Sequence, residues 1–226
     1  MTDVIKFSLG LLPSLAWLTF FLAEDRRRPE PKKLIFLAFA AGALSTLLVL
    51  QIQLLLQKTV NVWNGNMGGP VMIFFLAAVE EMIKFAVVYW VVRKRREFDE
   101  PIDPMIYMVV AALGFAAVEN IASVIRSVNG LELIVLRFIG ATLLHGLSSG
   151  IIGYWWAKGL MQKGGPWPKI ISGLLLATLV HAVFNYLIIK MGPGIFVTLF
   201  LIVIAFFILY DFERLKYVDY IKPRQV

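Results

Sequence analysis

The chain contains no cysteine. A thiol nucleophile, a thiolate metal site and a structural disulfide are therefore all excluded. Charged residues are also scarce, at 16% of the chain, whereas hydrophobic residues make up 59%. Because a soluble globular domain is only about 45–50% apolar, this composition indicates an integral membrane protein.

A bilayer span needs about 20 mostly apolar residues. The sequence offers seven such runs, at 4–23, 34–56, 70–92, 105–126, 133–157, 169–190 and 194–210. The loops between them are short, and no low-complexity tract or clear internal repeat is present. The predicted fold is all-α, a polytopic membrane bundle of about seven transmembrane helices that forms a single transmembrane domain over residues 1–226.

Positive charge is unevenly divided between the loops. The first run does not resemble a cleaved signal peptide, because its basic cluster at 26–28 follows the apolar stretch. Assigning alternate loops to the two sides places 16 of the 22 Lys and Arg residues on one side and five on the other. The positive-inside rule then predicts an outside N-terminus and a cytoplasmic C-terminus. Topology and anionic lipid thus account for the net charge of +7, and nucleic acid is not expected as a partner.

Two adjacent glutamates, Glu80 and Glu81, lie in the middle of the third run. One charge at the centre of a span costs roughly 3 kcal/mol on insertion-type scales. Together with Lys84 and Glu119, the uncompensated cost is on the order of 10 kcal/mol. An intramembrane cluster of this kind predicts a functional site.

Polar side chains recur at similar depth in four consecutive runs. They are Glu80, Glu81 and Lys84, then Glu119 and Asn120, then His145, Ser148 and Ser149, and finally His181 and Asn185. Pairs four residues apart share one helix face. Such pairs occur in each run: Glu80 and Lys84, Phe115 and Glu119, His145 and Ser149, His181 and Asn185. The only two histidines of the chain fall in this layer, so we expect one shared site.

Two chemistries fit this layer. Two histidines and a glutamate form a catalytic Zn²⁺ ligand set with a position left open for water. Without metal, a glutamate could deprotonate water while one histidine orients it, and His181 with Asn185 could stabilise the oxyanion. Both chemistries are hydrolysis within the membrane, and the residues alone leave both open.

Other hydrolytic sites are disfavoured. No H-E-x-x-H motif exists, because Gly146 follows His145 and Ala182 follows His181. All six aspartates lie outside the runs or at their edges, which argues against an aspartyl dyad. A serine route through Ser148 or Ser149 with His181 would leave the glutamates without a role.

Four motifs resemble the PrsW intramembrane proteases, which are distant relatives of the type II CAAX prenyl endopeptidases and the Abi membrane proteins. The motifs are E-E-M-I-K at 80–84, F-A-A-V-E-N at 115–120, His145, and H-A-V-F-N at 181–185. The segment F-D-E-P-I-D at 98–103 also looks like the family, and the similarity spans roughly 30–210.

The resemblance implies a protease of the bacterial plasma membrane. Its substrate would be a membrane-anchored protein such as an anti-sigma factor, cut near the extracytoplasmic side as the first step of regulated intramembrane proteolysis. The site residues implied are Glu80 and Glu81 as base or ligand, Glu119 in the second motif, His145 and His181 as catalytic or ligating groups, and Asn185 at the oxyanion. If Zn²⁺ is bound, His145, His181 and Glu119 would hold it.

The chain departs from the family pattern at Pro104 and Met108, where glycine is expected, and at Ser149, where a small residue is common. These positions concern loop geometry and substrate choice more than chemistry. In the prenyl endopeptidases the second motif carries a histidine where this chain has Glu119, so that mechanism transfers only in part.

Supporting roles are assigned to the remaining polar residues. Lys84 follows Glu80 by four residues, the favourable order for an ion pair on a helix. That pairing would leave Glu81 freer to act as the base, whereas the resemblance favours Glu80, and the choice stays open. Less specific roles are expected of four others: packing for Phe115, a backbone hydrogen bond for Asn120, and interfacial positions for Arg126 and Arg137.

Two other functions use the same residues. Glutamate and histidine chains also relay protons in transporters, although the inverted repeats and paired broken helices of such proteins are missing here. A non-catalytic scaffold or immunity protein would use the polar layer only to hold helices together.

Overall fold

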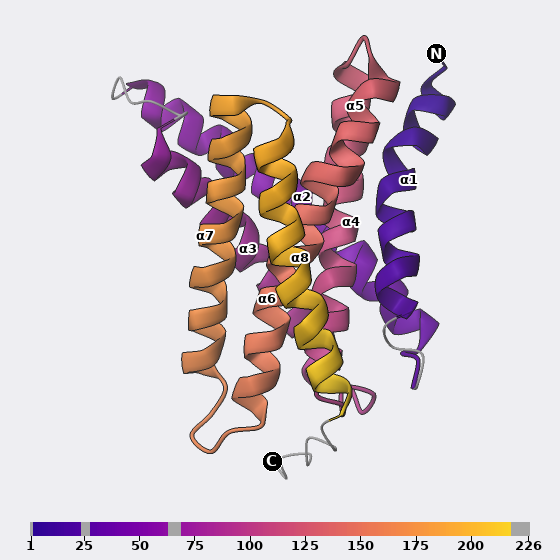
Figure 1. The fold of residues 1–226 in the computed structure, drawn as a ribbon, viewed down its shortest axis with the longest axis vertical. Helices are drawn as coiled ribbons and strands as arrows, with labels where there is room; N and C mark the ends of the chain where they lie inside the picture. The colour runs from indigo at the N-terminus through magenta and orange to yellow at the C-terminus, as the bar shows by residue number, and fades with distance from the viewer. Residues whose placement is uncertain (1, 24–27, 63–68, 218–226) are drawn as a thin grey trace.

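The computed structural model describes residues 2–23, 28–62 and 69–217, and the regular secondary structure of these residues is helical, with no strand among them. In chain order the elements are α1 (Asp3–Leu22), α2 (Lys32–Val62), α3 (Pro70–Val92), α4 (Asp103–Arg126), α5 (Gly130–Arg137), the π-helix η2 (Phe138–Thr142), α6 (Leu143–Leu160), α7 (Trp167–Met191) and α8 (Ile195–Lys216). Because α5, η2 and α6 follow one another without a break, they form one span (Figure 1).

The predicted all-α bundle of about seven spans is confirmed. In the described ranges, six helical stretches are long and apolar enough to cross a membrane: Asp3–Leu22, Lys32–Thr59, Asp103–Arg126, Gly130–Leu160, Trp167–Met191 and Ile195–Lys216. The remaining long helix, α3, has 23 residues but carries Glu80, Glu81 and Lys84 at its centre. The predicted runs are mostly shorter than the observed helices, because those helices continue past the apolar residues at one or both ends of the run.

The start of α1 and the end of α8 lie at opposite ends of the bundle (Figure 1). An odd number of crossings requires this arrangement. Which end faces the cytoplasm remains a prediction from the basic loops.

Helix α4 is the central element of the bundle. It is buried continuously from Asp103 to Ala117, and α1, α2 and α6 all pack on it. The approach of α2 is very close, since a Cβ on Gly42 would lie 1.9 Å from the carbonyl oxygen of Ala111. Helix α1 approaches at Gly10, where a Cβ would lie 2.6 Å from the Cα of Ile121. Small residues permit such close packing in membranes, where the hydrophobic effect between helices is weak.

The segment at 98–103 has a structural role in the connection between α3 and α4. The Asp103 carboxylate accepts hydrogen bonds from the backbone N–H groups of Asp99 and Glu100, both at 2.8 Å. The Tyr107 hydroxyl donates to Glu30, just before α2, and burial raises the pKa of the Glu30 carboxyl. These contacts fix the start of α4 against the start of α2, so the helix that carries Glu119 enters the bundle in a defined position.

Candidate active site

Glu81 lies at the centre of the polar layer, fully buried in the middle of α3. Its Oε1 is 2.7 Å from the Lys84 ammonium, 2.9 Å from the Ser148 hydroxyl and 2.7 Å from His181 Nδ1. Its Oε2 accepts from the Ser149 hydroxyl at 3.2 Å. With four donors around it, Glu81 is suited to orient its neighbours rather than to take a proton. Both serine hydroxyls are used here as donors to a carboxylate.

The expected pairing of Lys84 with Glu80 is wrong, because Lys84 pairs with Glu81 three residues before it. Spacings of three and four residues both bring side chains together on a helix. The choice is made by the neighbouring helices, since α6 brings His145 Nδ1 to 3.3 Å from Lys84 Nζ. The ammonium also lies 5.3 Å from the centre of the Phe115 ring, which packs on His145 as expected of it.

The hydrogen bonds assign the tautomers of both histidines. An ammonium can only donate, so His145 Nδ1 accepts from Lys84 and its Nε2–H donates to Glu119 at 2.9 Å. His181 Nδ1–H donates to Glu81, which leaves Nε2 with a free lone pair. That lone pair faces Glu80 Oε2 at 3.6 Å.

Glu80 has one satisfied and one unsatisfied oxygen. Its Oε1 accepts from the Gln53 amide of α2 at 2.8 Å. Its Oε2 is buried, and no other group in the described ranges hydrogen-bonds to it. A buried carboxylate oxygen without a donor is costly unless a water or ion satisfies it. The space beside Glu80 Oε2 and His181 Nε2, within reach of both atoms, is therefore the natural position for a bound water or ion.

A second group of contacts surrounds Glu119. Its Oε2 is 3.3 Å from an Arg137 amino group, and Arg137 Nε donates to the Asn120 amide oxygen at 2.5 Å. The Asn120 amide nitrogen donates to the Thr142 hydroxyl at 2.9 Å. The expectation that Asn120 bonds a backbone group is wrong, because both ends of its amide contact side chains. The interfacial position expected of Arg137 stays a prediction. The π-helix at 138–142 lies between Arg137 and His145 and adjusts their relative rotation.

Three residues could hold a metal ion together. One ligand atom each from Glu80, His145 and His181 lies within 4.8 Å of the others, and all three residues are buried. Two imidazoles and one carboxylate match a catalytic zinc set. The resemblance implied Glu119 as the third ligand and left Glu80 as base or ligand, whereas Glu119 here contacts His145 Nε2–H as a supporting carboxylate does. To bind the ion, His145 would have to give up its contact with either Lys84 or Glu119, because both of its ring nitrogens are engaged.

A cavity of about 500 Å³ opens next to Glu80, between α2, α3 and α7. Its polar lining consists of Gln53, Gln57, Glu80, Arg126 and Asn185, and its apolar lining includes Leu50 and Ile73. Asn185 thus faces the space beside Glu80, and the structure describes no hydrogen bond from it to His181. The cavity volume is in the usual range of ligand pockets, and Glu80 is part of the cavity lining.

Sequence reasoning missed two residues of this site, Gln53 and Arg137. A signal for Gln53 exists, because Gln51, Gln53 and Gln57 are polar residues inside an apolar run. Arg137 carries no comparable signal, since an arginine near the start of a run is the usual pattern of an interface.

The family model of the PrsW family intramembrane metalloproteases matches residues 30–210. A protein named Protease PrsW from Geobacillus kaustophilus (strain HTA426) is 29% identical over 222 residues, 97% of this chain and 95% of that protein. Proteins of the same name from Oceanobacillus iheyensis and Bacillus subtilis (strain 168) are 30% identical over 181 residues and 26% identical over 192 residues. These alignments cover 80% and 84% of this chain, and 81% and 85% of those proteins. No solved structure matches the chain.

Proposed function

The chain belongs to the PrsW family of intramembrane metalloproteases, and we propose that it hydrolyses a peptide bond in a membrane-anchored protein, with Glu80 as the base that activates water. The family match and the relatives support the assignment of this chain as a protease that is a multi-pass bacterial membrane protein. The proposed substrate is a single-span protein of the anti-sigma type, cut near its extracytoplasmic side.

The observation that carries this proposal is the unsatisfied oxygen of Glu80. Glu81 has four donors and Glu119 contacts His145 and Arg137, whereas Glu80 Oε2 faces only the lone pair of His181 Nε2 at 3.6 Å. A carboxylate that serves as a base needs an oxygen with an open lone pair on the substrate side. Glu80 combines that oxygen with a position in the lining of the cavity between α2, α3 and α7.

The proposed reaction begins with a water that lies beside Glu80 Oε2 and His181 Nε2 and is hydrogen-bonded to both. His181 accepts one hydrogen bond from this water and orients it, while Glu80 takes the other proton as the oxygen attacks the carbonyl carbon. Glu80 then passes that proton to the nitrogen of the leaving amine, and the C–N bond breaks. The products are one new carboxyl end and one new amino end, so atoms and charge balance.

Glu81 and Lys84 do not react in this step but hold His181 in position, since Lys84 pairs with Glu81 and Glu81 contacts His181. The Glu81 carboxylate holds His181 Nδ1–H at 2.7 Å and so fixes the tautomer in which Nε2 faces the water. In this tautomer neutral His181 cannot donate to an oxyanion. Of the two residues predicted at the oxyanion, only Asn185 retains N–H donors on the cavity side, and we assign that role to its amide.

A divalent metal such as Zn²⁺ fits the donor set of Glu80, His145 and His181. When bound there, it would supply Lewis acidity that polarises the carbonyl and lowers the pKa of the attacking water. With the ion bound, Glu80 and His181 would serve as its ligands instead of holding the water directly. His145 would give up its contact with Lys84 or Glu119.

The cavity supports an access route between α2, α3 and α7. A peptide must unwind to be cleaved, and unwound backbone is tolerated at membrane depth only where polar groups meet it. Gln53, Gln57 and Asn185 provide amide donors and acceptors along this cavity. Arg126 at the end of α4 adds a positive charge at the same cavity.

The proposal is tested by mixing the purified protein and a single-span anti-sigma-type protein in liposomes and determining product masses. Wild type and the matched surface variant Glu132→Ala, which changes an exposed glutamate of α5, are expected to give the same two fragments. Glu80→Ala and His181→Ala are expected to give none while still inserting into the bilayer. Full cleavage by both site variants would refute the proposal.

A further inference from the structure

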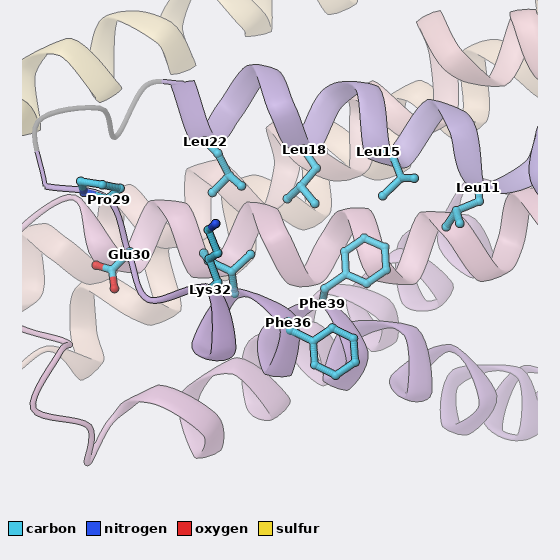
Figure 2. A pocket seen from close by; sticks show the side chains of 10 residues that line it. Leu11, Leu15, Leu18, Leu22, Pro29, Glu30, Lys32, Phe36 and Phe39 are labelled. Atoms are coloured by element: carbon cyan, nitrogen blue, oxygen red, sulfur yellow. The ribbon is translucent and has the colours of Figure 1, made fainter.

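An apolar groove of about 450 Å³ lies between α1 and α2, outside the proposed active site. We call it the α1–α2 groove; its lining is Leu11, Leu15, Leu18, Leu22, Pro29, Glu30, Lys32, Ile35, Phe36 and Phe39. Figure 2 shows the four leucines pointing from α1 toward α2 along the length of the groove, with Lys32 near its end by Leu22.

The groove exists because α1 and α2 both pack on α4 and, in the described ranges, hardly on each other. Gly10 brings α1 against Ile121, and Gly42 brings α2 against Ala111. Trp17 adds a further anchor for α1, since its indole N–H donates to the Phe138 carbonyl at 2.8 Å. The two helices are therefore held apart by their attachments to a third.

The chemistry of the lining requires an apolar occupant along most of the groove. Seven of its ten residues are Leu, Ile or Phe, and Phe36 is 69% exposed. An apolar wall without neighbouring atoms loses its dispersion contacts, and water would find no partner there. In a bilayer, an acyl chain satisfies both conditions.

One end of the groove is different because it carries a cation. Figure 2 shows the Lys32 amine between the two helices, and Lys32 is an exposed residue. The neighbouring Glu30 accepts a hydrogen bond from Tyr107 of α4. This end belongs to the basic connection that the positive-inside rule places in the cytoplasm, where anionic lipids are concentrated.

We propose that the α1–α2 groove binds one anionic phospholipid, with an acyl chain along the leucines of α1 and the phosphate at Lys32. The apolar length and the single cation at its end match the two parts of such a lipid. The apolar face of a transmembrane helix would fill the leucine-lined part of the groove, whereas a phospholipid also supplies a phosphate for Lys32.

The proposal is tested by native mass spectrometry of the detergent-purified protein with added phosphatidylglycerol or phosphatidylcholine. Wild type is expected to retain one phosphatidylglycerol in preference to phosphatidylcholine. Lys32→Glu is expected to weaken phosphatidylglycerol binding about tenfold, the loss of one charge-assisted contact. The matched control is Lys33→Glu, an exposed neighbour outside the groove, which is expected to bind as wild type does.

A second pair of variants tests the apolar part. Leu15→Trp fills the groove and is expected to displace both lipids, whereas Leu12→Trp, on the same helix but outside the lining, is not. Equal retention of the two lipids by wild type would overturn the proposal, as would identical binding by Lys32→Glu and Lys33→Glu. Loss of a dimer in Leu15→Trp with lipid binding unchanged would show instead that a second copy covers the groove. If Leu15→Trp fails to fold, the lysine pair still decides.

Discussion

Lys84 and Glu81 form an ion pair in which neither side chain has any exposed surface, with Nζ 2.7 Å from Oε1. Burial of both charges means that neither can be relieved by solvent when its partner is removed. The pair also holds the two histidines, since Lys84 contacts His145 and Glu81 contacts His181. It is therefore the structural centre of the site rather than its reactive group.

Lys84→Met is expected to destabilise the protein by roughly 3–5 kcal/mol, because it leaves Glu81 buried without its counter-charge. The double variant Lys84→Met/Glu81→Gln should recover part of this loss, since no uncompensated charge remains. Denaturant unfolding in detergent measures both. The control is Glu213→Gln in the Lys216–Glu213 pair of α8, where Glu213 is 56% exposed and the change should be about 1 kcal/mol or less. Equal destabilisation in the two pairs would contradict this account.

Gln53→Leu is expected to lower the cleavage rate about 10- to 100-fold, because Gln53 holds Glu80 Oε1 at 2.8 Å. The loss should appear in kcat, since the orientation of the base matters in the transition state. Gln51→Leu, an exposed glutamine two residues earlier on α2, is the matched control and should leave the rate unchanged. Equal effects of the two substitutions would show that Gln53 does not position Glu80.

Metal binding distinguishes the proposed ligand set of Glu80, His145 and His181 from the set with Glu119 that the resemblance implied. Elemental analysis after dialysis against Zn²⁺ is expected to show that Glu80→Ala, His145→Ala and His181→Ala lose the ion. Glu119→Ala should only weaken binding, by about 10- to 100-fold, as a supporting partner of His145 does. Retention of zinc by Glu80→Ala together with its loss in Glu119→Ala would restore the set with Glu119.

Gly42→Val is expected to destabilise the bundle by at least about 1–3 kcal/mol, the usual result of overpacking. A Cβ at Gly42 has only 1.9 Å to the Ala111 carbonyl oxygen, and backbone cannot move aside as a side chain can. Gly194→Ala is the control, because a Cβ there meets no atom within 4 Å. The melting temperatures of the two variants in detergent provide the comparison. A melting temperature of Gly42→Val equal to that of Gly194→Ala would contradict the close α2–α4 contact.

Much of the fold follows from the sequence alone, because a bilayer leaves the backbone few choices. The run at 70–92 and α3 (Pro70–Val92) coincide, since Pro70 opens the helix and basic residues close it. The polar layer follows in the same way, because residues at equal depth on neighbouring helices meet in the bundle. Its four helices, α3, α4, α6 and α7, do bring Glu81, Glu119, His145 and His181 together.

Pairing within the layer could not be predicted. Glu80 and Glu81 lie four and three residues before Lys84, and both spacings allow a contact on a helix. The distinction comes from the serines and histidines of α6 and α7. The position of Arg137 depends on the π-helix at 138–142, and no residue type in F-I-G-A-T signals it. The proposed third metal ligand is Glu80, whereas Glu119 was expected. The sequence does not reveal this difference, because packing sets the rotation of each helix.

The most direct measurement is the cleavage rate of Glu80→Gln in liposomes that contain the single-span substrate, beside wild type and with equal melting temperatures confirmed. Gln keeps the shape of Glu80 and its contact with Gln53 but cannot take a proton. The account predicts a fall of about 10²- to 10⁴-fold, the usual contribution of a general base. An unchanged rate in folded Glu80→Gln would contradict it.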